Sequence, residues 1–332
     1  MNISHLASLT DDIGLFEHCL FAEPRTSHGY CVDDVSRGLT VLMRSDDRSD
    51  EARRLIDTYI AFLSAAQQPD GTIINRRDCE GRWYGPASTE DHWGRALWAW
   101  GTLVRESGDT NRAAEAYEHF RISARRRSVF LRSMVFASLG ASQVLDVLPG
   151  NRVALAVLED TIAMLPEAPP GKWVWPESRL TYANAAVAEA MMLAGFHTNR
   201  NDVIRRGRHA LEWLWQLQSE ADHLSITPHT GWLPGDSLPA FDQQPIEVAA
   251  LVDACATAYD LTSDPIWSQR MMIGQRWFDG HNDQGIAMRD SRTGAGYDAL
   301  TLDSRNENQG AESTIAVMSV AQQTSVHLES VD

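Results

Sequence analysis

The sequence has few of the features by which several classes of protein are recognised. Basic residues are scarce, with 29 Lys and Arg against 45 Asp and Glu, a net charge of −16 over 332 residues. Binding to nucleic acid needs a basic surface that neutralises phosphates, so we expect no nucleic-acid partner. No apolar run approaches the roughly 20 residues of a membrane span, and the N-terminus lacks a secretory pattern. The sequence therefore predicts a cytoplasmic protein without a membrane span.

Cysteine pairs and phosphate-binding loops are equally sparse. The four cysteines are scattered and form no CxxC pair: Cys19, Cys31, Cys79 and Cys255. Zinc sites and disulfide frameworks both use closely spaced cysteines, so neither is expected. No Walker loop and no GxGxxG loop is present. We therefore expect reduced thiols, no metal and no cofactor.

Strand-like alternation is nearly absent, whereas helical periodicity recurs along the whole chain. A short helical piece is expected near residues 10–21. After it the pattern predicts eleven helices, at 33–44, 51–67, 90–107, 110–125, 128–147, 151–165, 179–197, 201–219, 245–261, 265–279 and 309–323.

The predicted helices alternate in character. One set is small and apolar on nearly all sides, which is typical of helices buried all round. These inner helices begin near Asp34, Asp91, Ser128, Thr181, Ile246 and Gly310. The other set has one apolar stripe and a charged face, as expected of outer helices.

Long connections indicate how this array of helical hairpins is arranged. Such arrays either stack into an open solenoid or close into a ring. The connections at 68–89, 166–178, 220–244 and 280–308 all lead from an outer helix into an inner one, so they share one rim. This favours a closed all-α ring. We expect a single domain over residues 1–332, with about the first 25 residues peripheral.

The rim segments gather carboxylates, amides and indoles. Sugar hydroxyls form directional hydrogen bonds with such polar groups, and the apolar face of a pyranose stacks on an aromatic ring. A cluster of acids with few lysines does not suit phosphate, so the expected partner is a neutral oligosaccharide or polysaccharide. Residues expected to bind it are His28, Tyr30, Asp33, Glu90, His92, Trp93, Arg95, Trp173, Trp175, Arg179, Tyr182, Asn184, Trp232, Gln243, Gln244, Glu307, Asn308 and Gln309.

Four rim motifs resemble one known group of proteins. They are "HGYCVDDVSRGL", "EDHWGRALWAWG", "WPESRLTYANA" and "NENQGAESTIA". Together with the alternating helices they resemble bacterial proteins of the six-hairpin glycosidase superfamily, from about residue 25 onwards. The resemblance implies an (α/α)6 barrel and a glycoside hydrolase in which two carboxyl groups cleave the bond, commonly with inversion.

The two carboxyl roles call for different environments. In the first turn of a helix the dipole stabilises the anion and lowers the pKa, which suits the base. Asp91 is the preferred base, and Asp34, Glu247 and Glu312 are alternatives. The acid needs a raised pKa, which apolar crowding supplies. Glu177 follows Trp173, Trp175 and Pro176, so it is the expected proton donor.

Other activities stay open on the same scaffold. A sugar epimerase or isomerase would move protons with rim histidines, for which His28, His92, His229 and His281 are available. A polysaccharide lyase would use Tyr30, Tyr84 or Tyr182, although the acidic balance disfavours anionic substrates. A glycoside phosphorylase would place phosphate at Arg95 or Arg179. A glycan-binding protein without catalysis is a further alternative.

Overall fold

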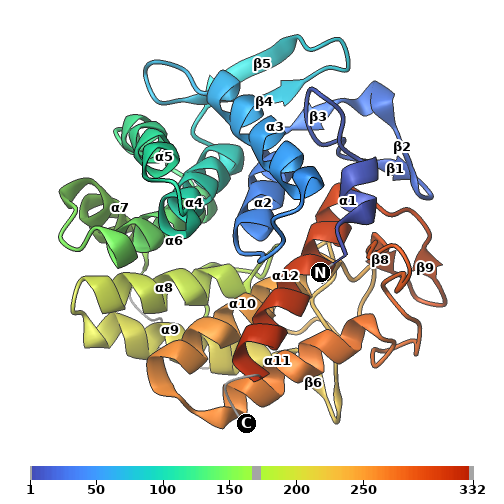
Figure 1. Ribbon diagram of the computed structural model, residues 1–332. Coiled ribbons are helices and arrows are strands. Elements are labelled where there is room, and N and C mark those ends of the chain that lie inside the picture. The colour runs from blue at the N-terminus through green and yellow to red at the C-terminus, as the bar shows by residue number, and fades with distance from the viewer. Residues whose placement is uncertain (1, 167–172, 329–332) are drawn as a thin grey trace.

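Helices of two kinds alternate along the chain in the computed structural model, which describes residues 2–166 and 173–328. The inner helices are α2 (Val32–Met43), α4 (Asp91–Glu106), α6 (Leu131–Val147), α8 (Ala185–His197), α10 (Pro245–Thr262) and α12 (Ala311–Leu328). The outer helices are α3 (Asp50–Ala66), α5 (Thr110–Ser123), α7 (Arg152–Met164), α9 (Asn201–Leu217) and α11 (Pro265–Phe278). Each inner helix packs against the next, and α12 returns to α2, which closes the ring (Figure 1). The predicted closed barrel is confirmed.

Residue size and polarity decide which helices are inner. In α8, ten of 13 residues are buried, whereas α9 buries only six of 17 along one face. Small residues also bring inner helices together. A Cβ atom added to Gly101 of α4 would lie 2.2 Å from the carbonyl oxygen of Gly140 in α6. The two helices therefore pack backbone against backbone, which only glycine allows.

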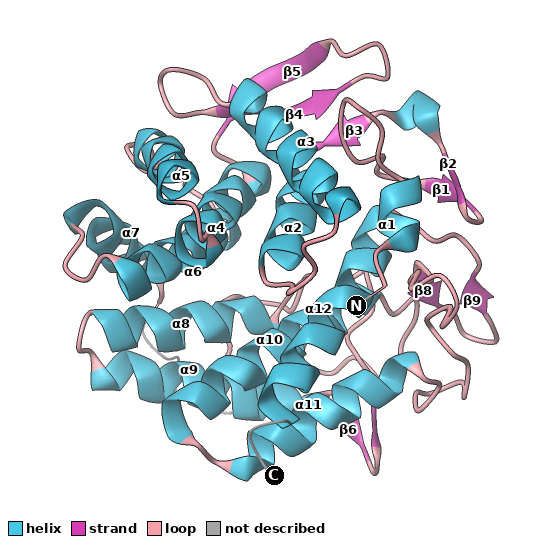
Figure 2. Cartoon of the chain, viewed as in Figure 1, coloured by secondary structure: helices cyan, strands magenta, loops and turns pink. Residues whose placement is uncertain are grey.

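Short strands lie along the rim, although strand-like alternation is nearly absent from the sequence. They are β1 (Cys19–Leu20), β2 (Glu23–Pro24), β3 (Tyr30–Cys31), β4 (Ile73–Arg77), β5 (Trp83–Ser88), β6 (Ser219–Glu220), β7 (His223–Leu224), β8 (Ala299–Leu300) and β9 (Arg305–Asn306). Strands β3, β4 and β5 form an antiparallel sheet, and the others pair in hairpins. All lie outside the helical ring in the segments that precede inner helices (Figure 2).

The predicted helix near residues 10–21 is wrong. A five-residue helix, α1 (Ser4–Ser8), lies earlier and packs against α12. The chain turns after it because the Asp11 side chain accepts hydrogen bonds from the backbone amides of Ile13 and Gly14, at 2.8 and 3.1 Å. Such a turn competes with helix.

Two inner helices begin later than predicted. Helix α8 starts at Ala185 because the preceding segment is extended, with Leu180 and Trp232 exchanging backbone hydrogen bonds of 2.9 and 3.1 Å. Helix α6 starts at Leu131, after a turn in which Ser128 accepts a hydrogen bond from the Phe130 amide. The other inner helices begin within about two residues of the expected positions.

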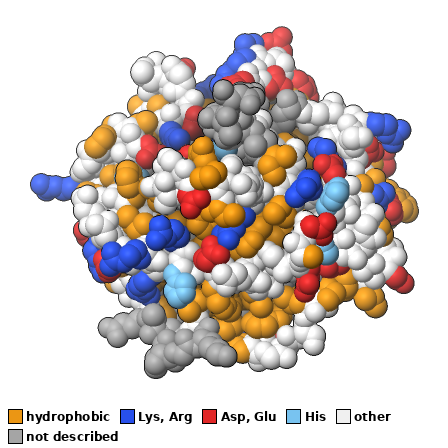
Figure 3. Space-filling view, turned by 90° about the horizontal axis from the view of Figure 1, so that it is seen from below, with side chains coloured by type: hydrophobic (Ala, Val, Ile, Leu, Met, Phe, Trp, Pro, Cys, Tyr) orange, Lys and Arg blue, Asp and Glu red, His pale blue; other side chains and the backbone are white. Residues whose placement is uncertain are grey.

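Among the described residues, no helix is long and apolar enough to cross a membrane. All four cysteines are free thiols, and only Cys79 is exposed. On the described part of the face shown in Figure 3, acidic and basic side chains are interspersed with hydrophobic ones.

Candidate active site

Two hollows meet at the N-terminal ends of the inner helices. The first, which we call the shaft, is a cavity of about 60 Å³ at the centre of the ring, and its walls are mostly apolar. The second, the rim cleft, has about 300 Å³ and a mostly polar lining from α2, α12, the N-terminal segment and the loops around residues 229–244 and 298–306. Arg37 and Glu312 line both. A wider hollow of about 630 Å³ lies between the outer helices α5 and α7 and involves no inner helix.

Arg37 joins two acids where the hollows meet. Its guanidinium donates to Asp34 Oδ1 and to Glu312 Oε2, both at 2.5 Å. Its Nε has no partner within the described residues, although it is buried. Asp34 is 2% exposed, whereas the Glu312 side chain is 39% exposed. Arg37 therefore pairs with one carboxyl group that is sealed from solvent, that of Asp34, and with one that is open to solvent, that of Glu312.

Arg95 continues this charged arrangement on α4. It lies 3.4 Å from Asp33 and 3.9 Å above the ring of Phe136, and burial lowers the pKa of its guanidinium to about 10. Its charged neighbours include Arg37, Asp33, Asp91 and Glu312. We call this group the belt: Asp33, Asp34, Arg37, Asp91, Arg95 and Glu312. The sequence predicted all of its members except Arg37.

The expected lowering of acid pKa values at helix starts is wrong for three of the four candidates. Burial raises the pKa of Asp34 to about 6 and that of Glu247 to about 7, and it also raises the pKa of Asp91. The helix dipole is worth at most about 2 kcal/mol, and loss of hydration for a buried carboxylate exceeds it. These acids therefore hold protons more readily than the sequence suggested.

Asp91, the first residue of α4, has a simple environment. It is half-buried, and Ser133 of α6 donates a hydrogen bond of 2.8 Å to its Oδ1. Within the described chain, its Oδ2 has no recorded donor. Burial is the main cause of its raised pKa, and Arg95 opposes the shift. A half-buried, loosely held carboxyl with a raised pKa can give a proton to a ligand.

Glu177 and Glu247 lie in a different network around Arg132 of α6. Arg132 donates to both carboxylate oxygens of Glu177, at 2.5 to 3.1 Å, and Trp175 adds a bond of 3.2 Å. Glu247 accepts from the backbone amides of Ala183 and Asn184 and from the Asn184 side chain. Neither glutamate lines the shaft or the rim cleft. We call these four residues the Arg132 network: Arg132, Glu177, Asn184 and Glu247.

The prediction that Trp93, Trp175 and Trp232 line one cleft is wrong. Their exposed fractions are 0%, 1% and 9%, and Trp93 belongs to a different core cluster from the other two. The indole N–H of Trp93 donates to the carbonyl of Ser123. That of Trp232 donates to the carbonyl of Asp236. These rings are fully used in packing, so they offer no face to a sugar.

Other predicted sugar contacts are divided between core and surface. Tyr30 and His92 are buried, and their polar atoms meet Asp11 and the carbonyl of Ile73. Gln243 and Gln309 are also buried. Trp173, Tyr182 and Asn308 are half-buried, and Gln244 lines the rim cleft. The remaining members are exposed: His28, Glu90, Arg179 and Glu307.

Sequence reasoning missed several residues around the hollows. Arg37 and Arg132 are single cations inside apolar inner helices, and that isolation was the available signal. His18 lies in the N-terminal piece, where a helix was wrongly expected, and Asp298 lies in a long connection, so no motif marked either residue. Both line the rim cleft together with His229, the one histidine named beforehand that reaches it.

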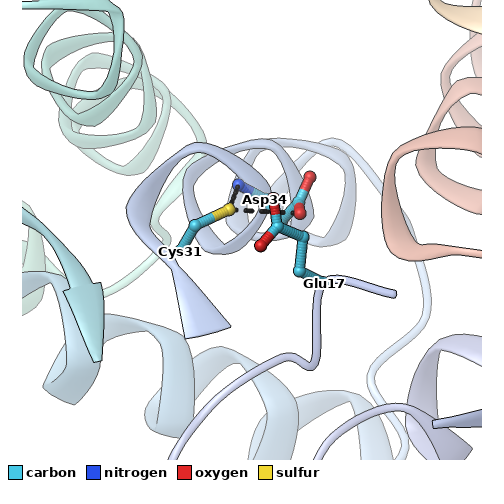
Figure 4. Close-up of side chains that lie close together, drawn as sticks. All are labelled: Glu17, Cys31 and Asp34. Carbon is cyan, nitrogen blue, oxygen red and sulfur yellow. Dashed lines mark hydrogen bonds between the residues drawn. The ribbon is translucent and has the colours of Figure 1, made fainter. Parts of the chain in front are cut away.

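Glu17, Cys31 and Asp34 place three metal-type donors within 4.8 Å of one another, pointing together at the start of α2 (Figure 4). Zinc binds the deprotonated thiolate. Burial raises the pKa of the Cys31 thiol, and the two carboxylates already pair with Arg76 and Arg37. The group therefore favours a protein-internal polar cluster over a cation site.

No family model matches the chain, and no curated protein matches it in sequence. Solved structures match nearly all of it. A sugar epimerase from a ruminal bacterium is 13% identical with a TM-score of 0.75, covering 99% of this chain and 96% of its own. The cellobiose 2-epimerase from Spirochaeta thermophila is 12% identical, with 97% and 93% covered and a TM-score of 0.68. The GH76 α-mannanase from Bacteroides thetaiotaomicron is 9% identical, with 99% and 94% covered and a TM-score of 0.65. The chain therefore has the (α/α)6-barrel fold of these solved structures.

Proposed function

We propose that this chain is a carbohydrate-active enzyme that hydrolyses glycosidic bonds, with Asp91 as the proton donor and Glu312 as the base. One observation carries this assignment. The two acids begin the inner helices on either side of α2, and both are charged neighbours of Arg95 at the shaft mouth. Burial raises the pKa of Asp91, whereas the Glu312 side chain is open to water, and a difference of this kind separates the acid role from the base role.

Asp91 has the properties of a general acid. Burial raises its pKa, and one of its oxygens lacks a protein donor among the described residues. Glycoside cleavage requires that a carboxyl group protonate the departing oxygen. This reverses the role expected from its place in the helix, because burial outweighs the dipole.

Glu312 has the properties of a base. Its side chain is open to water and lines both hollows. Arg37 holds its Oε2, which orients the group and leaves Oε1 to accept a proton from a water molecule.

The placement favours inversion over retention. Packed helices lie about 8–10 Å apart, so helices separated by one neighbour in a ring of six lie roughly 15 Å apart. Two side chains that reach inward from α4 and α12 leave room for a sugar and a water between them. An inverting pair needs carboxyl groups roughly 6.5–9.5 Å apart for that reason.

A neutral sugar fits the surroundings. Acids and arginines alternate in the belt, and the buried Arg37 Nε, which has no partner in the described part of the chain, can donate to a hydroxyl oxygen. The solved structures that share the fold are named as two epimerases and a mannanase, all acting on carbohydrates.

The test is incubation with a panel of oligosaccharides, with and without phosphate, followed by chromatography and NMR of the anomeric products. We expect new reducing ends of inverted configuration, independent of phosphate. Sugar phosphates would instead identify a phosphorylase, and products of retained configuration would remove the Asp91–Glu312 assignment.

A sugar epimerase is the second candidate, because His18 and His229 line the same rim cleft. Two bases on one cleft can remove a proton from one face of a sugar and return it to the other. Incubation of reducing sugars in deuterium oxide distinguishes this activity: an epimerase would incorporate deuterium and isomerise the sugar without cleaving a bond.

A further inference from the structure

The end of the shaft away from the rim contains an acid that the proposed reaction does not use. Glu189 of α8 is 5% exposed and lines the cavity. Its Oε1 accepts a hydrogen bond of 3.3 Å from Thr257. Its Oε2 is buried without a partner within the described residues. An unpaired buried acceptor costs about 1–3 kcal/mol, so its place suggests a ligand group.

The neighbouring acid at the same end is fully engaged. Asp253 of α10 accepts from Arg44 at 3.3 Å, from Gln323 at 2.7 Å and from Ser319 at 3.1 and 3.2 Å. The Asp253–Arg44 pair is therefore satisfied within the shaft wall, whereas Glu189, which lines the same cavity, keeps an oxygen without a partner among the described residues.

Two unpaired donors belong to other residues that line the shaft. The indole N–H of Trp98 has no partner among the described residues, and neither does the Nε of Arg37 at the mouth. Donors and an acceptor around one cavity suit a group that both accepts and donates a hydrogen bond, and a hydroxyl does both.

The size of the shaft limits that group. Its volume of about 60 Å³ is a fifth of the 300 Å³ of the rim cleft. Alanines make up much of the wall, including Ala186, Ala249 and Ala250. The narrow, mostly apolar shaft therefore suits a small substituent of a sugar better than the whole sugar, for which the rim cleft has more room.

We propose that the shaft is a specificity pocket for the exocyclic hydroxymethyl group of a hexose whose ring lies at the mouth, beside Arg37 and Glu312. The inference rests on the proposed carbohydrate function and extends it to a substrate class. The hydroxyl reaches Glu189 directly or through one water. Pentoses lack the group, and a uronate would place its carboxylate against Glu189 and Asp253.

Matched sugars test this without knowledge of the natural substrate. D-glucose and D-xylose, D-mannose and D-lyxose, and D-galactose and L-arabinose differ only by the hydroxymethyl group. We expect at least one hexose to bind about tenfold or more tightly than its pentose partner, by calorimetry or saturation-transfer NMR. D-glucuronate should bind more weakly than D-xylose. Equal binding within every pair, or no hexose binding at all, would overturn the proposal.

Variants of shaft residues test whether the preference for hexoses arises in the shaft. Glu189→Met removes the acceptor at similar volume, and Ala249→Val fills the shaft; each should reduce hexose binding to the pentose level and leave pentose binding unchanged. Glu189→Gln, which keeps a polar end, should retain most of the preference. Glu159→Met, on the exposed side of α7, is the matched control. If the shaft variants weaken hexoses and pentoses equally, the cavity holds water only.

Failure of this inference is separable from failure of the hydrolase. Hydrolysis without hexose preference would remove the pocket and keep the enzyme. Hexose preference that depends on Glu189, without cleavage of any oligosaccharide, would keep the pocket and remove the hydrolase.

Discussion

The belt and the Arg132 network lie on the same rim, and both place acids beside buried arginines, yet they offer opposite chemistry. In the Arg132 network, every oxygen of Glu177 and Glu247 accepts hydrogen bonds from the protein. In the belt, Asp91 and Glu312 each accept from one side chain among the described residues, and Glu312 borders both hollows. The number of protein donors therefore separates the acids that can act on a ligand from those that the protein itself occupies.

The difference originates in where the arginines lie. Arg132 also donates to the backbone carbonyls of Tyr182 and Ala183, so it fixes the segment that leads into α8. Arg37 and Arg95 instead line the shaft. The first arginine closes a loop onto the barrel, and the other two border space that a ligand can enter.

The largest effect should come from the belt acids. Asp91→Asn and Glu312→Gln should each lower kcat by about 10²–10⁴-fold with the fold intact, because general acid–base help is worth that much. On substrates with a good leaving group, Asp91→Asn should keep much of its kcat, because such a leaving group needs little protonation. Glu177→Gln is the comparison: an equal loss of kcat at unchanged stability would move the proton donor back to the Arg132 network.

The next largest effect should come from replacing Arg132, the cation of the Arg132 network. Arg132→Met should destabilise the protein by up to about 3–5 kcal/mol, because it leaves the half-buried Glu177 and the buried Glu247 without their cation. Urea unfolding measures this, and adding Glu177→Gln should restore part of the loss. Arg37→Met should also cost stability, because it leaves the sealed Asp34 without its cation, and it should lower activity as well, because Glu312 loses its donor. An equal loss of activity for both arginine variants would contradict the contrast.

A smaller effect should come from Trp93, and it distinguishes a packing role of this ring from a sugar-binding role. Trp93→Phe should cost about 1–3 kcal/mol, less than the 3–5 kcal/mol typical of Trp→Ala in a core, because part of the ring remains. The KM for any sugar substrate should stay unchanged. A several-fold rise in KM at unchanged stability would reinstate Trp93 as a sugar contact.

The last prediction concerns pH, where the effect is small for each step of one pH unit. Burial raises the pKa of Glu247 from 4.5 to about 7, so the folded state binds more protons than the unfolded state between these values. Stability should therefore fall as pH rises through this window, by up to about 1.4 kcal/mol per pH unit. Glu247→Gln should flatten the curve. An unchanged slope would mean that its three donors keep Glu247 ionised.

The sequence predicted the order of the inner and outer helices and most of their boundaries to within a few residues, because small apolar inner helices and striped outer helices differ at every turn. It failed for the N-terminal helix and for the starts of α6 and α8. It predicted five of the six belt residues, because these stand at helix starts. It failed for the indoles. Trp93 lies two residues from such a start in sequence, but its side chain points into the core. Sequence distance from a helix start does not report the direction of a side chain.

Hydrophobic periodicity by itself determined that this chain forms alternating inner and outer helices, because burial of apolar faces depends on local pattern. The long connections of the sequence added the expectation of a closed ring with acids on one rim. Only the tertiary structure decided which acids are sealed and which are open. That outcome depends on Arg37, Arg95 and Arg132, whose partners come from segments as far apart as Arg37 and Glu312. It also depends on desolvation, which raised the pKa values that the dipole alone would have lowered. Both effects arise from the surroundings assembled by folding, which no single stretch of sequence contains.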